Sequence, residues 1–152
     1  MDLSIIIPAY KDPYLNKTIE SIHETFETDY EIIPVLDGVD PTEPLPDYPE
    51  VHPIRLPDNV GMRRAINAGV RAAQGTYLMR SDAHCMFATG FDAVILDTIQ
   101  DNWIVDAKRY FLDPVTWTVM EEVVMTSQLT TPHPPQGTSR STGSRGGTPA
   151  AP

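Results

Sequence analysis

The residues of this chain best suited to chemistry follow a short apolar run, within the stretch from Gly75 to Cys85. Asp82 and His84 stand two residues apart there, and side chains with this spacing on extended backbone point to the same side. A carboxylate oxygen and an imidazole nitrogen suit a divalent ion such as Mn²⁺ or Mg²⁺, with positions left open for a ligand's oxygens. The alternative is that Asp82 caps the next turn and His84 is an ordinary polar residue, because so short a motif has many false matches.

A second carboxylate, Asp37, also follows an apolar run, residues 31–36. With Gly38 behind it, the pair considered alone is typical of a simple turn. Asp37 is a candidate site residue because it follows a predicted strand.

Apolar, β-branched runs predict the strands that must carry these side chains. They cover residues 3–7, 31–36, 51–56, 76–79 and 103–107, with Pro34 and Pro53 weakening the second and third. Helical spacing predicts three helices: one begins at Asp12 as N-cap, one runs from an Asp58 or Asn59 cap to about Gln74, and one spans about 90–100. Their expected inward residues are Leu15, Ile19, Ile22 and Phe26; Met62, Ala65, Ile66, Gly69, Val70 and Ala73; Phe91, Val94, Ile95 and Ile99.

This order of strands and helices predicts an α/β domain with a mainly parallel sheet flanked by helices. Ligands of such sheets bind at the carboxyl ends of the strands, where Tyr10, Asp37 and Asp82 to His84 all fall. We expect residues 1–129 to form the domain. Residues 130–152 are low in complexity, without buriable periodicity, and are predicted to be a disordered tail.

Composition limits the classes of function. The chain has 152 residues, and residues 1–125 hold all 21 acidic and 9 of the 11 basic ones, a formal net charge of −12. So acidic a body argues against a general nucleic-acid surface. Cys85 is the single cysteine, which excludes an internal disulfide and a zinc site built on cysteines. No apolar run has signal-peptide or membrane-span character, so a cytoplasmic location and no transmembrane segment are expected.

Several segments in order resemble family 2 glycosyltransferases. Ser4–Tyr10 is similar to the opening strand of that family, Glu31–Asp40 to its second strand and following turn, and Asn59–Gly69 with Gly75–Leu78 to the helix and strand before its metal motif. Asp82-Ala83-His84-Cys85, followed by Gly90-Phe91, is similar to the polypeptide N-acetylgalactosaminyltransferase branch.

The resemblance implies a GT-A fold, the Rossmann-like fold of nucleotide-diphospho-sugar transferases, truncated because family members continue with an acceptor half. It implies roles by position. Ala9 and Tyr10 would line the nucleoside pocket, Asp37 would accept a hydrogen bond from uracil, and Asn59 and Arg64 would contact the nucleotide. Asp82, also in the substrate site, would hold Mn²⁺ (or Mg²⁺) together with His84.

The leading hypothesis is therefore metal-dependent transfer of a hexosyl or N-acetylhexosaminyl group from a nucleotide-sugar, expected to be UDP-linked, to a glycan, polypeptide or small-molecule acceptor. A nucleotide-sugar-binding domain without transferase activity is the alternative, and a plain α/β interaction module is a third hypothesis. Leu36, Arg80 and Ser81 depart from the family pattern. The sequence identifies no catalytic base.

Overall fold

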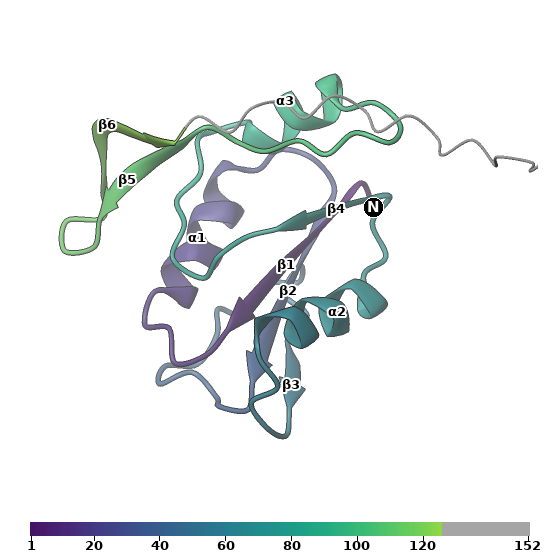
Figure 1. Cartoon of the computed structure of the whole chain (residues 1–152), viewed down its shortest axis with the longest axis vertical. Coiled ribbons are helices and arrows are strands. Elements are labelled where there is room, and N and C mark those ends of the chain that lie inside the picture. The colour runs from purple at the N-terminus through teal and green to yellow at the C-terminus, as the bar shows by residue number, and fades with distance from the viewer. Residues whose placement is uncertain (126–152) are drawn as a thin grey trace, which may run out of the picture.

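The computed structural model describes residues 1–125 and contains one parallel sheet between helices (Figure 1). The sheet has the order β3-β2-β1-β4, with every neighbouring pair parallel. The predicted tail, residues 130–152, lies outside the described residues. The elements are β1 (Leu3–Ala9), α1 (Leu15–Thr25), β2 (Tyr30–Asp37), β3 (Ile54–Leu56), α2 (Met62–Ala72), β4 (Tyr77–Arg80), α3 (Phe91–Thr98), β5 (Arg109–Asp113) and β6 (Thr118–Met125).

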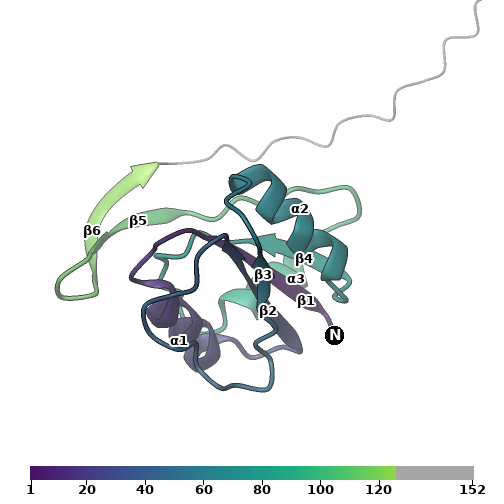
Figure 2. The same cartoon turned by 90° about the horizontal axis from the view of Figure 1, so that it is seen from below.

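Helices α1 and α2 cover opposite faces of the sheet, as Figures 1 and 2 both show. On the α1 face, alternate residues of β1 and β2 pack with the predicted apolar stripe of α1. On the α2 face, Ile6, Ile33 and Val35 pack with Ala65. Both faces of β1 and β2 are therefore buried, which explains why these strands are continuous apolar runs instead of alternating ones. The predicted α/β class is confirmed.

Pro34 lies inside β2 without breaking it. The neighbouring Ile32 donates its N–H to the carbonyl of Glu50 and accepts from the N–H of His52, each at 2.8 Å. The next N–H of β2 on that side would belong to Pro34, which has none, so the pairing with β3 resumes only at Ile54. The predicted third strand is therefore shorter than residues 51–56, because proline cannot donate to a ladder.

Two helix starts differ from the prediction. Helix α1 begins at Leu15, and Asp12 instead accepts the N–H of Tyr14 at 2.9 Å. Helix α2 begins at Met62 after Gly61, and neither Asp58 nor Asn59 caps it. Two residues predicted to face inward on α2 are also largely exposed, Met62 at 59% and Val70 at 40%.

Helix α3 buries a carboxylate where an apolar stripe was expected. Val94 is 66% exposed, whereas Asp92 is fully buried. Asp92 accepts the backbone N–H groups of Glu27 and Thr28 and the Thr28 hydroxyl, at 2.6–3.1 Å. Burial raises the pKa of Asp92, but these hydrogen bonds outweigh it and hold the pKa below the ordinary value. Asp92 thereby fastens α3 to the chain that follows α1.

The strand predicted at residues 103–107 is not present; the chain there is irregular. The strands beyond α3 are β5 and β6, an antiparallel pair separate from the main sheet. Within residues 1–125, no helix is long and apolar enough to span a membrane.

A buried hydrogen-bond network fixes the start of β4. The Glu31 side chain, 2% exposed, accepts the Ser4 hydroxyl at 2.6 Å and the Gln74 N–H at 2.7 Å. The Ser4 oxygen in turn accepts the N–H of Gly75 at 2.8 Å. Because every link is satisfied, this carboxylate can be buried while it joins β1 and β2 to the segment between α2 and β4.

Candidate functional site at the strand ends

Three segments meet at the carboxyl-terminal edge of the sheet. Tyr10 directly follows β1, Asp37 ends β2, and the segment 81–84 follows β4. The pairing of Ala9 with Leu36 and of Ile6 with Arg80 places these strand ends beside one another. The edge is the predicted one for ligand binding in a parallel sheet.

Asp37 is 3% exposed and holds the turn that leads into α2. Its Oδ1 accepts the N–H of Val60 at 2.7 Å and its Oδ2 accepts the N–H of Gly61 at 2.9 Å. These two N–H groups directly precede the first residue of α2, so a carboxylate from a neighbouring strand fixes the turn into the helix and places negative charge at its start. Each oxygen keeps a further lone pair for another donor.

Gly38 lets the two turns approach closely. Its φ is +80°, and a Cβ on it would stand 2.3 Å from the backbone nitrogen of Asn59. Asn59 is therefore pressed against the turn after β2, with its side chain exposed, and Arg64 is exposed in the first turn of α2. Tyr10 is also exposed, at 49%, whereas Ala9 is buried.

Helix α1 holds the segment that contains Asp82 and His84. The Thr18 hydroxyl donates to the carbonyl of Ala83 and accepts the N–H of Cys85, both at 2.9 Å. The Ser21 oxygen accepts the N–H of Phe87 at 3.0 Å. Two buried hydroxyls on one helix face thus fix the backbone around His84.

His84 is paired with a residue that sequence reasoning treated only as a helix cap. Its Nδ1 lies 2.8 Å from Oδ2 of Asp12, with the imidazole 59% exposed and the carboxylate 18% exposed. Because an ionised carboxylate can only accept, Nδ1 carries the proton and Nε2 of the neutral ring offers its lone pair. The contact spans 72 residues of sequence, so no local pattern could have indicated it.

Asp82 is paired with Arg80, whose guanidinium donates to Oδ1. The second carboxylate oxygen is left for another partner. Arg80 also lies 3.6 Å from the Met62 sulfur at the start of α2. A guanidinium beside a carboxylate gives this strand end both signs of charge, which suits a phosphate ligand and a cation together.

These side chains suit a divalent ion only in an open site. Within residues 1–125, no group of three or more His, Cys, Asp and Glu side chains could hold one. A closed structural site is therefore excluded there. An open site fits, because Nε2 of His84 and an oxygen of Asp82 are available and ligand oxygens could supply the other positions. The Asp12–His84 pair matches the carboxylate–histidine arrangement that orients metal-binding imidazoles.

Cys85 does not add a thiolate to this set. Burial raises the pKa of its thiol, and the nearby Asp82 carboxylate adds to the rise, which outweighs the hydrogen bond with Ser81. The thiol is therefore protonated at neutral pH and is a poor nucleophile or metal ligand.

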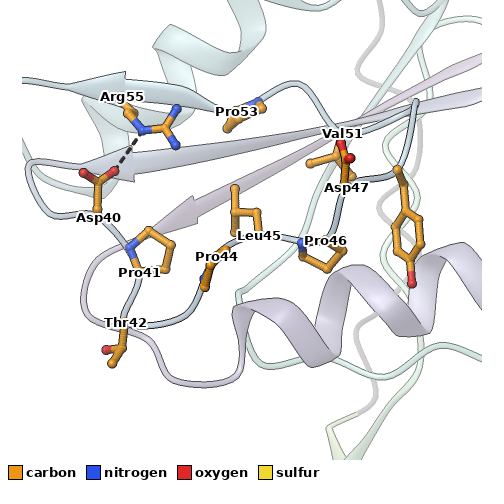
Figure 3. Close-up of a pocket in the computed structure, with 11 residues that line it drawn as sticks. Asp40, Pro41, Thr42, Pro44, Leu45, Pro46, Asp47, Val51, Pro53 and Arg55 are labelled. Atoms are coloured by element: carbon orange, nitrogen blue, oxygen red, sulfur yellow. Dashed lines mark hydrogen bonds and ion pairs between the residues drawn. The ribbon is translucent and has the colours of Figure 1, made fainter.

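Two cavities of the described residues are lined mainly by residues other than the predicted site residues. One of about 520 Å³ is formed by the loop after β2 together with β3, and the Asp40–Arg55 ion pair (2.9 Å) borders it (Figure 3). None of the predicted site residues lines that cavity. A smaller one, of about 220 Å³, includes Asp12 among its lining residues. The strand-end chemistry and not the larger cavity therefore identifies the candidate site.

Comparisons with known proteins agree with this architecture. The family described as "Glycosyl transferase family 2" matches residues 4–141. The crystal structure of S. aureus TarS residues 1–349 is similar, with a TM-score of 0.50 and 18% identity over 64% of this chain and 31% of that one. A second crystal structure of S. aureus TarS has a TM-score of 0.52 and 14% identity, over 74% of this chain and 25% of that one. The chain thus spans less than a third of either. No curated protein matches.

Proposed function

Because the chain belongs to glycosyl transferase family 2, with the GT-A, Rossmann-like fold predicted for it, we propose that it transfers a sugar from a nucleotide-sugar donor to an acceptor. The donor would be UDP-linked and would bind at the carboxyl-terminal edge of the sheet. The observation that carries the proposal is the Asp12–His84 contact, because it engages Nδ1 of an imidazole that stands two residues from Asp82 and leaves Nε2 available to a ligand.

The nucleoside would lie between the ends of β1 and β2. Tyr10 is exposed there and can contact the base or ribose, while Ala9 offers backbone. Asp37 keeps lone pairs for the N–H of uracil after binding Val60 and Gly61. Asn59, before α2, and Arg64, in its first turn, would contact the nucleotide; both are exposed.

The diphosphate would lie at the end of β4. Asp82 and His84 would hold Mn²⁺, or Mg²⁺, and when bound that ion would stabilise the charge on the departing UDP. Arg80 would provide a guanidinium for the phosphate oxygens once it turns from Asp82. The sugar would be a hexosyl or N-acetylhexosaminyl group, in keeping with the resemblance of Asp82-Ala83-His84 to the polypeptide-modifying branch.

Calorimetry with UDP, with and without Mn²⁺, tests this proposal. Mn²⁺ should tighten UDP binding. Asp82→Ala and His84→Ala should each lower the UDP affinity measured with Mn²⁺ by at least about tenfold. His52→Ala, at an exposed histidine before β3, is the matched control and should keep it. Equal UDP affinity in EDTA and in Mn²⁺ would reject the metal site.

Turnover separates transfer from donor binding alone. UDP release from a UDP-sugar in the presence of acceptors supports a transferase. Tight, metal-dependent UDP binding without any release would favour the nucleotide-sugar-binding alternative. No binding of UDP at all would leave the plain α/β interaction module.

A further inference from the structure

The tip of the β5–β6 hairpin is a defined turn. Oδ1 of Asp113 accepts the N–H groups of Val115 and Thr116 at 2.8 and 2.9 Å, and its carbonyl accepts the N–H of Trp117 at 2.9 Å. Trp117 adopts a φ of +54°, which an ordinary residue takes only where its surroundings hold it. The turn thus fixes the backbone that carries the Trp117 side chain.

The Trp117 side chain extends to the start of α1. Figure 2 shows the hairpin beside this helix. The indole stacks on the ring of Tyr14, with centroids 5.5 Å apart and planes at 22°. The ammonium of Lys17 lies 4.9 Å from the Trp117 ring and 5.8 Å from the Tyr14 ring. Val115, on the same tip, is 87% exposed, so of these two side chains only that of Trp117 packs against α1.

Tyr14 connects this contact to the candidate site. Its backbone N–H donates to Oδ1 of Asp12 at 2.9 Å, and Oδ2 of the same carboxylate lies 2.8 Å from Nδ1 of His84. Both oxygens of Asp12 are therefore engaged, one by the backbone of Tyr14, whose ring stacks on Trp117, and one by the imidazole.

We propose that Trp117 is a positioning residue that acts through Tyr14 and Asp12 to orient the His84 ring. The inference rests on the proposed role of His84. Because that ring is 59% exposed, packing constrains it little, and its orientation depends on Asp12. Asp12 in turn depends on where the Tyr14 backbone is held. The hairpin would thereby belong to the donor site although it pairs with no strand of the main sheet.

A ligand-free measurement tests the relay. The chain has four histidines and two tryptophans. In ¹⁵N–¹H spectra of the imidazoles, with the His84 signals assigned by His84→Gln, the parent should show the neutral ring protonated at Nδ1. Trp117→Ala should shift His84 towards a mixture of tautomers, and Trp117→Phe should remain near the parent. Trp103→Ala, the matched control, should change nothing at His84. A parent-like His84 spectrum in Trp117→Ala overturns the inference.

Calorimetry then links the relay to ligand binding. Trp117→Ala should weaken Mn²⁺-dependent UDP binding about three- to tenfold, less than loss of a direct ligand, whereas Trp103→Ala should stay within about twofold. If both variants bind like the parent, Trp117 does not position the site. If the parent binds no UDP, the proposed function fails while the imidazole spectra still decide the relay.

Discussion

Replacement of Asp37 by Asn tests the idea that a strand-end carboxylate stabilises the turn into a helix of the neighbouring layer. The substitution keeps the shape of the side chain and removes its charge. The carboxylate oxygens accept from Val60 at 2.7 Å and Gly61 at 2.9 Å. An amide can accept from one of these groups, but its NH₂ must face the other donor.

The cost follows from these contacts. One N–H left without a partner at a site that is 3% exposed costs about 1–3 kcal/mol. Removal of negative charge from the start of α2 adds about 0.3–1 kcal/mol. The expected destabilisation is therefore about 2 kcal/mol, which corresponds to a fall in Tm of roughly 4–8 °C for a domain of this size.

Urea unfolding followed by circular dichroism measures this change. The midpoint should fall while the slope stays constant, since the surface exposed on unfolding is the same. Asp40→Asn is the matched control, because its carboxylate is 70% exposed in an ion pair with Arg55 and should contribute under about 1 kcal/mol. If Asp37→Asn is as stable as Asp40→Asn, Asp37 does not stabilise the start of α2.

Two further stability tests follow from buried contacts. Because the pKa of Asp92 is lowered on folding, its contribution is present above pH of about 4 and is lost as pH falls towards the folded pKa. Asp92→Asn should cost about 1–3 kcal/mol at pH 7 and flatten the acid limb of a pH–stability curve; an unchanged limb would contradict this. Gly38→Ala should cost well over about 2 kcal/mol, because strain at φ +80° adds to a clash with Asn59. Gly61→Ala, at φ +86° with no atom within 4 Å of the added Cβ, should cost clearly less stability. Equal losses of stability in the two variants would show that crowding at Gly38 is unimportant.

The layers of this fold were predictable because their signals are local. Continuous apolar runs mark β1 and β2, and the stripe Leu15–Ile19–Ile22 marks α1, since burial on both faces or on one stripe is decided by each segment's own residues. The same holds for the placing of Asp37 and Asp82 at strand ends.

The errors arise where a partner distant in sequence replaces a local signal. The start of α2 was misplaced because the turn before it is fixed by Asp37 on β2, through the N–H groups of Val60 and Gly61. The inward face of α3 was predicted in part: Phe91 packs against the core, but Val94 is exposed. Asp92 is buried instead, because backbone N–H groups after α1 stabilise it in the interior. The run at 103–107 has strand-like residues but no strand to pair with. Asp12 was missed as a partner of His84 because the two residues are 72 positions apart in the sequence.

The two edges of the main sheet differ in how they would meet another extended chain. Strand β3 spans only three residues, and Pro53 and Pro57, which flank it, have no N–H to offer. Such an edge resists the addition of a strand. Strand β4, at the opposite edge, has no proline within it, and its Leu78 is 52% exposed. Growth of the sheet, whether by a further segment or by self-association at high concentration, is therefore directed to β4.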